Sequence, residues 1–146
     1  MHAPLDYECP FCQLLQRGDG PKDREIVYEN EFVAVFPAKH QKLGNEGILL
    51  IIPRQHIENL YQLPIELAQP LLEATQRAAN ALKSVLSCDG ITIRQNNEPS
   101  GGQDVWHYHV HVVPRYDGDK YVNAKFVLAS EDVRFTLAKA LKEAAT

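Results

Sequence analysis

Three histidines at alternate positions are the residues of this sequence that are best equipped for chemistry. His107, His109 and His111 lie in the stretch 103–114, which reads Gln-Asp-Val-Trp-His-Tyr-His-Val-His-Val-Val-Pro. Successive side chains of a β-strand point to opposite faces, so this spacing predicts three imidazoles on one face of a strand. Large apolar and β-branched neighbours favour a strand over a helix. The residues between the histidines are expected to pack into a core: Trp106, Tyr108, Val110 and Val112.

Three imidazoles on one face are compatible with three kinds of arrangement. The face could be a polar surface that happens to be rich in histidine. It could bind zinc through three histidines, with water as the fourth ligand. It could also hold one nucleophile between two helpers, because mutual repulsion of protonated rings lowers their pKa and leaves neutral nitrogens. The spacing alone leaves these alternatives open.

A Cys-x-x-Cys pair, Cys9 and Cys12, is the second group with potential chemistry. Such a pair serves redox chemistry or supplies half of a zinc site. The redox interpretation requires a thioredoxin-like βαβ unit, and none follows the pair. A zinc site requires two further ligands from elsewhere in the chain. His56 follows an apolar stretch, but a single histidine beside a strand is most often an ordinary core or surface residue.

Several motifs together resemble those of the histidine triad superfamily of nucleotide hydrolases and transferases. The triad is followed by Val-Val-Pro-Arg and preceded by Gly102-Gln103, and residues 51–56 read Ile-Ile-Pro-Arg-Gln-His. With Cys9-Pro-Phe-Cys12, these motifs match the pattern of bacterial members. The resemblance extends over nearly the whole chain, from about Cys9 to Lys120.

The resemblance implies a structural zinc ion. Some bacterial triad proteins bind zinc through the cysteine pair, the histidine after the Ile-Pro strand and the first triad histidine. The matching residues are Cys9, Cys12, His56 and His107. Two thiolates and two imidazoles form a closed site, so His107 would take no direct part in chemistry.

The resemblance also implies the catalytic roles of the other two triad histidines. His109 is expected to attack the α-phosphorus of a purine nucleotide derivative, which gives a nucleotidyl-histidine intermediate that water then cleaves. The second ring nitrogen of His109 should donate to a backbone carbonyl and so fix the tautomer. His111 is expected to hydrogen-bond a phosphoryl oxygen and stabilise the transition state.

Four residues before the triad are expected to bind the substrate. The resemblance assigns Asn96 and Gln103 to the phosphate side of the substrate, and Gly102 would let the backbone approach the phosphate. Asp104 stands where some branches have Ser or Thr in contact with the leaving group. An acid there could protonate a departing amine or repel an anionic leaving group, and we expect it to disfavour highly phosphorylated ones.

Two positions depart from the family pattern. Ile48 replaces a histidine that usually follows Gly47, and Ala38 stands where an acid or Asn usually holds the ribose. Phosphoramidates and dinucleoside polyphosphates are the candidate substrates, and Pro114-Arg115-Tyr116 leans toward the latter. The two departures keep open an alternative function, a nucleotide-binding regulatory dimer with little turnover.

Composition limits the class of protein. The chain has 146 residues, 45% hydrophobic and 23% charged, with a net charge of −4. We expect one domain over residues 1–146, with a real core. The absence of a basic stripe argues against a nucleic-acid polymer as partner, and no apolar run is long enough to suggest a membrane protein. Three cysteines form no disulfide framework, which suits a reducing cytoplasm.

The order of the expected elements predicts an α+β fold with an antiparallel five-stranded sheet. One long helix and a C-terminal helix accompany the sheet, and the resembling family usually joins two sheets into one continuous sheet in a homodimer. The expected helices are Phe11–Arg17, Pro64–Leu86 with a bend at Pro70, and Glu131–Ala145 with Ser130 as N-cap. The expected strands are Glu25–Glu29, Phe32–Pro37, Ile48–Pro53, Gly90–Arg94 and the triad stretch.

Overall fold

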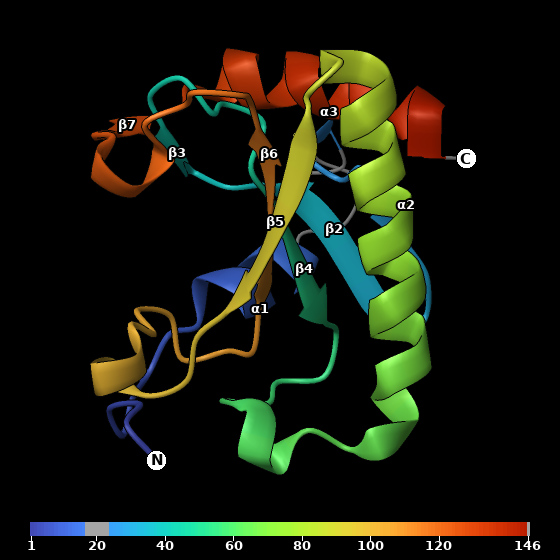
Figure 1. Cartoon of the computed structure of the whole chain (residues 1–146). Helices are drawn as coiled ribbons and strands as arrows, with labels where there is room; N and C mark the ends of the chain where they lie inside the picture. Colours follow the sequence, from blue (N-terminus) through green and yellow to red (C-terminus); the bar gives the residue numbers. More distant parts are fainter. Residues whose placement is uncertain (17–23, 146) are drawn as a thin grey trace.

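An antiparallel sheet with helices against it forms the centre of the molecule (Figure 1). The computed structural model describes residues 1–16 and 24–145. In chain order the elements are α1 (Pro10–Gln16), β1 (Tyr28–Glu29), β2 (Val33–Pro37), β3 (His40–Lys42), β4 (Leu49–Pro53), the 3₁₀ turns η2 (Leu60–Gln62) and η3 (Ile65–Leu67), α2 (Ala68–Leu86), β5 (Gly90–Gln95), η4 (Pro99–Gly101), β6 (Val110–Arg115), η5 (Tyr121–Asn123), β7 (Phe126–Leu128) and α3 (Glu131–Ala145). The expected end of the first helix at Arg17 lies outside the described residues.

The main sheet has the order β1-β2-β4-β6-β5, and every neighbouring pair is antiparallel. All five residues of β4 are buried, because other strands flank it and both faces of the sheet are covered. This explains its continuous apolar sequence, Leu-Leu-Ile-Ile-Pro. The α+β class, the five-stranded antiparallel sheet, the long helix and the C-terminal helix are confirmed.

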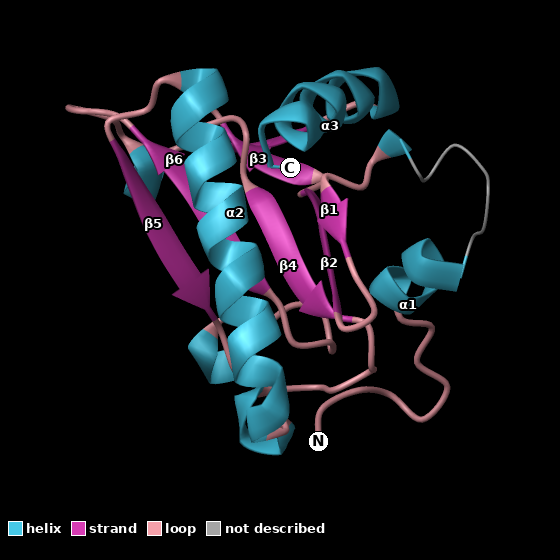
Figure 2. Ribbon diagram, turned by 90° about the vertical axis from the view of Figure 1, so that its right-hand side faces the viewer, coloured by secondary structure: helices cyan, strands magenta, loops and turns pink. Residues whose placement is uncertain are grey.

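Each face of the sheet carries its own core. On one face, side chains of alternate strand residues such as Val35, Ile51 and Val112 pack with α2 and α3. On the other face, Phe36 and Leu50 pack with residues of α1 and the N-terminal segment. Figure 2 shows α2 lying across one face of the sheet and α1 beside β1 and β2. The second face is the one that carries the triad histidines.

The long helix begins later than predicted. Pro64–Leu67 form an extended residue and the 3₁₀ turn η3, and α2 starts at Ala68. Pro70 lies in the first turn of α2, where its missing N–H would have no intrahelical acceptor. It therefore suits the start of the helix instead of bending it. None of the described helices is long and apolar enough to cross a membrane.

A second, two-stranded sheet was not expected from the sequence. β3 pairs with β7, and the sequence predicts no strand in either of these stretches. The buried side chain of Gln41 supports this region through four hydrogen bonds: its Nε2 donates to the carbonyls of Ala38 (2.7 Å) and Ile48 (3.1 Å), and its Oε1 accepts from the amides of Gly47 (3.1 Å) and Ile48 (2.8 Å).

Replacing Gln41 with leucine is expected to destabilise the protein by about 2–4 kcal/mol, because buried backbone groups lose their partners while the volume is nearly kept. Urea unfolding monitored by circular dichroism measures the change. The exposed Gln69 offers a matched control, and Gln69→Leu should shift the free energy of unfolding by less than about 0.5 kcal/mol. Equal effects of both variants would contradict the structural role of Gln41.

Asp119 organises the turn after β6. Its carboxylate accepts from the Arg115 guanidinium at 2.8 Å, from the amide of Tyr116 at 2.9 Å and from the side chain of Asn45 at 2.8 Å. These bonds favour the ionised form, so the Arg115 guanidinium above all holds the pKa of Asp119 well below its usual value of 3.8. A lowered pKa means that Asp119 stabilises the fold above the unfolded pKa, and that this contribution fades as the pH falls below it.

Asp119→Asn is therefore expected to lower the melting temperature at neutral pH. The difference from the wild type should shrink below about pH 4, because the unfolded wild-type chain then takes up a proton at Asp119 that the folded carboxylate does not bind. Thermal unfolding across this range measures both quantities. Asp117→Asn changes an exposed neighbour in the same turn and serves as control. A difference that stays constant down to about pH 3 would count against the ionic role of Asp119.

The C-terminal helix starts as predicted. The Ser130 hydroxyl accepts from the amide of Val133 at 3.3 Å, which is the bond of an N-cap. Arg134 on this helix is buried and ion-paired to Glu25 at 2.9 Å.

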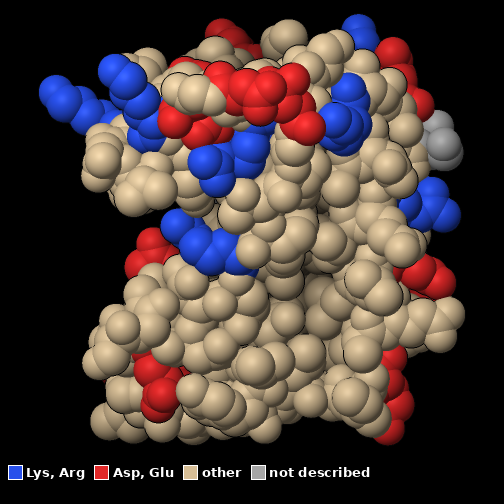
Figure 3. Space-filling view, in the orientation of Figure 1, with Lys and Arg blue, Asp and Glu red and all other residues tan. Residues whose placement is uncertain are grey.

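On the face drawn in Figure 3, Lys and Arg lie among Asp and Glu and form no large patch of one sign.

Candidate active site and metal centre

The triad histidines enter the site from an extended segment and from the strand that follows it. His107 and His109 precede β6, and only His111 lies within it, so the strand begins later than predicted. From Tyr108 to Val112 the side chains nevertheless alternate between the two faces, and the amide of Tyr108 holds this segment by donating to the Ile57 carbonyl at 2.6 Å. Three of the intervening residues lie in the core against α2, as expected: Tyr108, Val110 and Val112.

Trp106 does not join that core. It is half-buried, and its ring lies 5.7 Å from the ring of His2 between centroids. Its amide donates to the Tyr7 hydroxyl at 3.1 Å. The N-terminal segment thus contacts the tryptophan that the sequence predicts in the core. The chain bends at residues 105–107, so the alternation seen from Tyr108 onward does not extend back to Trp106.

His109 has the geometry of a fixed neutral imidazole. Its Nδ1 lies 2.7 Å from the His107 carbonyl, which can only accept, so Nδ1 carries the proton and Nε2 keeps its lone pair. The residue is 3% exposed, and burial lowers the pKa of its ring below 6.5. The edge of Phe11 packs against the ring at 5.3 Å between centroids.

His111 stands next to His109, with ring centroids 4.9 Å apart. Burial, followed by the positive charges of His109 and Arg94, lowers its pKa to about 4. Its Nδ1 is buried and has no hydrogen-bond partner among the described residues. A neutral His111 can therefore donate one hydrogen bond on the same face as His109.

The four residues assigned to zinc come together from three distant parts of the chain. The ligand atoms of Cys9, Cys12, His56 and His107 all lie within 4.8 Å of one another. The Nδ1 of His107 is 3.3 Å from the Cys9 sulfur, 3.6 Å from the Cys12 sulfur and 3.2 Å from the Nδ1 of His56. The Nε2 of His107 donates to the Pro53 carbonyl at 2.9 Å, which directs Nδ1 toward the sulfurs.

These distances agree with the edges of a zinc tetrahedron. Zinc bonds of about 2.3 Å to sulfur and about 2.0–2.1 Å to nitrogen imply edges of roughly 3.6 Å between sulfur and nitrogen and roughly 3.3 Å between nitrogens. Without a cation, burial and the neighbouring Cys9 thiol raise the pKa of Cys12 to about 12. A divalent cation would supply the positive charge that two thiolates require.

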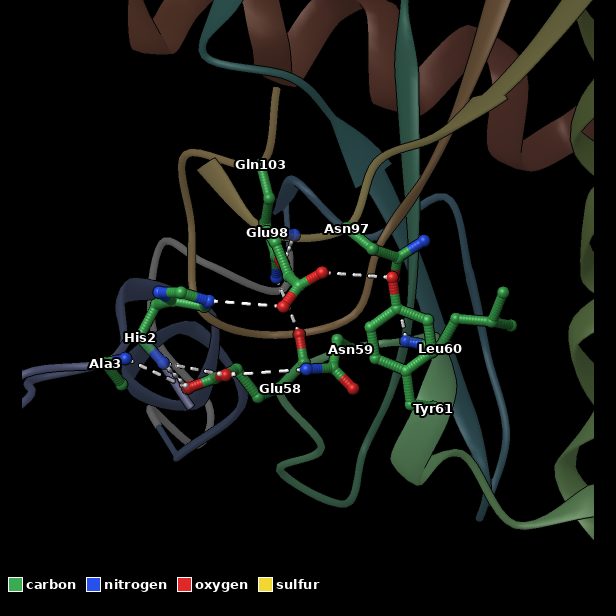
Figure 4. A network of polar contacts seen from close by, with 9 residues as sticks. All are labelled: His2, Ala3, Glu58, Asn59, Leu60, Tyr61, Asn97, Glu98 and Gln103. Atoms are coloured by element: carbon green, nitrogen blue, oxygen red, sulfur yellow. Dashed lines mark hydrogen bonds and ion pairs between the residues drawn. The ribbon is translucent and has the colours of Figure 1, made fainter. Parts of the chain in front are cut away.

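Gln103 holds the loop before the triad in shape (Figure 4). Its Oε1 accepts from the amide of Glu98 at 2.8 Å, and its Nε2 donates to the carbonyls of Glu58 (2.6 Å) and Val105 (3.1 Å). Both polar atoms of this buried side chain are therefore engaged within the protein. The sequence predicts that Gln103 contacts the phosphate, but its polar contacts in this structure are with the backbone of Glu58, Glu98 and Val105.

The N-terminal segment is tied to the same network. The nearly buried Glu58 carboxylate accepts from the amides of His2 (3.1 Å) and Ala3 (3.0 Å). Glu98 receives the Tyr61 hydroxyl at 3.1 Å and lies 3.3 Å from the His2 ring nitrogen (Figure 4). The loop before the triad is thus held by contacts with the N-terminal segment and with residues 58–61.

The remaining predicted substrate residues lie at the open side of this loop. The side chain of Asn96 donates to the Gly102 carbonyl at 3.2 Å. Gly102 has a φ of +87°, and an added Cβ would lie 3.4 Å from the Asn96 amide nitrogen, so a larger residue would be strained. Asp104 is 84% exposed, and its Oδ1 is 3.8 Å from the free Nε2 of His109.

Ala38 and Ile48, the two residues that depart from the family pattern, make apolar contacts. Both are buried in the core on the triad face, and the Ala38 amide donates to the Ile48 carbonyl at 2.9 Å.

Sequence reasoning missed Arg94, whose charge acts on both His109 and His111. Arg94 stands opposite His111 because of the register in which β5 and β6 pair. This register joins distant parts of the chain, and no local feature of the sequence predicts it.

Comparison with known proteins indicates the same family as the sequence motifs do. The family model "HIT domain" matches residues 20–118. Protein hit of Bacillus subtilis is 38% identical over 108 residues, which are 74% of this chain and 71% of that protein. Adenosine 5'-monophosphoramidase HNT1 of Saccharomyces cerevisiae is 31% identical over 117 residues, 79% of this chain and 67% of that protein.

A crystal structure of a zinc-bound histidine triad family protein from Mycobacterium smegmatis superposes with a TM-score of 0.77 at 29% identity, covering 94% of this chain and 93% of that one. The family model covers more than half of the chain, and the fold, the motifs and the relatives agree with it. The chain belongs to the HIT domain family.

Proposed function

We propose that the protein is a nucleotide hydrolase or nucleotidyl transferase that acts on the α-phosphate of purine nucleotide derivatives. The observation that carries the proposal is the bond from His109 Nδ1 to the His107 carbonyl, which leaves Nε2 free and neutral. Nε2 attacks the α-phosphorus, the bond to the leaving group breaks, and the leaving group takes a proton from solvent. Water then cleaves the phosphorus–nitrogen bond and releases the nucleoside monophosphate.

The other residues on this face support the two displacements. His111 donates to a phosphoryl oxygen, where charge develops in the transition state. Asn96 and Gly102 border the phosphate side of the substrate, and Gln103 keeps their loop in place through its bonds to Glu58, Glu98 and Val105.

Asp104 lies beside the leaving group in this proposal, where its carboxylate disfavours strongly anionic leaving groups. Asp104→Ser should therefore raise the preference for a dinucleoside polyphosphate over a phosphoramidate. An unchanged preference would remove this role.

Phosphoramidates and dinucleoside polyphosphates are the two candidate substrate classes. The name of the yeast relative supports the first class. The sequence Pro114-Arg115-Tyr116 favours the second only weakly, because Arg115 is engaged by Asp119 within its own turn.

The deciding experiment measures release of adenosine monophosphate from an adenylate phosphoramidate and from a diadenosine polyphosphate. Turnover of either supports the enzyme, and the preferred substrate identifies the class. A nucleotide-binding regulatory dimer is the second candidate, which the apolar environment of Ala38 and Ile48 favours. Tight binding of adenosine monophosphate without turnover would select it.

We further propose a structural zinc ion at Cys9, Cys12, His56 and His107. The donor set and the distances between the donor atoms support it, as does the zinc-bound structural relative. Bound zinc would fasten the N-terminal segment to the sheet and hold His107, whose carbonyl orients His109. Zinc binding requires Cys9 and Cys12 as reduced thiolates, so the proposed site is suited to a reducing, cytoplasmic setting.

A homodimer completes the proposal, with one domain over residues 1–146 in each protomer. β5 is an edge strand of six residues, and Ile93 at its centre is 49% exposed. A long edge strand with an exposed apolar residue is suited to pairing with a second copy. Ile93→Lys should lower the mass measured by light scattering from that of a dimer to that of a monomer. Ile65→Lys, at a residue that is 81% exposed outside the sheet, should leave the mass unchanged.

A further inference from the structure

Arg94 lies on the triad face of the sheet. It stands directly opposite His111 in the β5–β6 pair, and His111 in turn stands opposite Leu50 of β4. Directly opposed residues of antiparallel strands project to the same face. Leu50 belongs to the core on the triad face, away from α2. The Arg94 side chain therefore starts from the same surface as His111, one strand closer to the edge of the sheet (Figure 1).

The positive charge of Arg94 is not neutralised within the described part of the chain. Three other described arginines have carboxylate partners: Arg54 pairs with Glu29, Arg115 with Asp119 and Arg134 with Glu25. Arg24 and Arg77 instead lie over the rings of Phe135 and Tyr28. No ion pair between described residues includes Arg94, and its Nε is buried without a hydrogen-bond partner. A guanidinium that is partly buried and lacks an acceptor is well suited to an anionic ligand.

One acidic and one basic residue flank the two histidines. Asp104, in the loop before the triad, lies 3.8 Å from His109 Nε2, whereas Arg94 stands opposite His111 on β5. An anionic phosphoryl group in front of His109 and His111 would therefore have a carboxylate on the side of the loop and a guanidinium on the side of β5.

We propose that Arg94 is a substrate-binding residue whose guanidinium holds the anionic oxygens of the phosphoryl group that His109 attacks. This inference rests on the proposed function and adds a phosphate contact from β5 to it. The guanidinium offers two parallel donors to a phosphate, and it offsets the repulsion that Asp104 exerts on the same anion. A lysine at this position would keep the charge but lose the paired donors.

The test compares the binding of adenosine monophosphate and adenosine by calorimetry, with the full-length wild type, Arg94→Gln and Arg94→Lys. Loss of a charge-assisted phosphate contact should weaken the binding of adenosine monophosphate by about tenfold or more in Arg94→Gln. Adenosine has no phosphate, so its affinity should not change. Arg94→Lys should lie between the wild type and Arg94→Gln. Lys142→Gln removes one positive charge from the exposed last turn of α3 and should bind both ligands as the wild type does.

The outcomes separate this inference from the proposed function. A wild type that binds neither ligand and turns over no substrate would overturn both. A wild type that binds adenosine monophosphate, with an equal affinity in Arg94→Gln, would overturn the role of Arg94 alone. Parallel weakening of both ligands in Arg94→Gln and Arg94→Lys would also overturn it, because a phosphate contact cannot change the binding of adenosine.

Discussion

His109→Ala should lower kcat for release of adenosine monophosphate by at least about 10⁴-fold, because it removes the proposed nucleophile. Burial of His109 and its bond to the His107 carbonyl leave Nε2 neutral and unprotonated on the triad face, as the proposed attack on phosphorus requires. The expected loss is in kcat, whereas KM for the preferred substrate should change little. Steady-state kinetics with both candidate substrates measures the two constants separately.

Two further variants serve as comparisons for His109→Ala. His111→Ala should lower kcat by about 10²–10³-fold, since it removes one stabilising donor and leaves the nucleophile in place. His40→Ala changes an exposed histidine of β3 and should behave as the wild type. Rapid acid quenching followed by mass spectrometry should detect the nucleotidyl adduct in the wild type and not in His109→Ala. Turnover that survives in His109→Ala would refute the covalent mechanism.

The local periodicity of the sequence was sufficient to predict how the triad side chains are distributed. His109 and His111 lie close together, and Tyr108, Val110 and Val112 pack on the opposite side. The prediction of a strand over all three histidines was wrong, because β6 begins only at Val110. Alternation survives this error because it depends on an extended backbone and not on strand pairing.

Features that depend on distant parts of the chain were harder to predict. Cys9 and His107 are 98 positions apart, and only the resemblance to a family indicated that they meet. Nothing local indicates that Gln103 bonds to the Glu58 carbonyl, or that Arg94 stands opposite His111. Such contacts follow from the register of the sheet and the path of the loops, and the hydrophobic pattern does not encode either of them.

Changing both Cys9 and Cys12 to serine is expected to abolish zinc binding and to destabilise the protein. The wild type should contain one zinc per chain, and the variant close to none, because serine does not replace a thiolate ligand. If free zinc exceeds its dissociation constant by a factor of about 1,000, the lost stabilisation is about 4 kcal/mol. Elemental analysis and thermal unfolding, each with and without a chelator, measure these effects. Cys88→Ser alters a buried thiol away from the cluster and should keep its zinc.

The same double variant also tests how the metal centre and the nucleophile are connected. His107 contributes Nδ1 to the cysteine cluster and its carbonyl oxygen to His109 Nδ1. Loss of the cluster should therefore free the His107 backbone and lower kcat through the orientation of His109. In the proposed mechanism none of the four zinc ligands contacts the substrate directly. Zinc that persists in the double variant but disappears in His109→Ala would give the opposite assignment. His109 would then be a ligand of a catalytic metal, and the free lone pair of its Nε2 would serve coordination instead of attack on phosphorus.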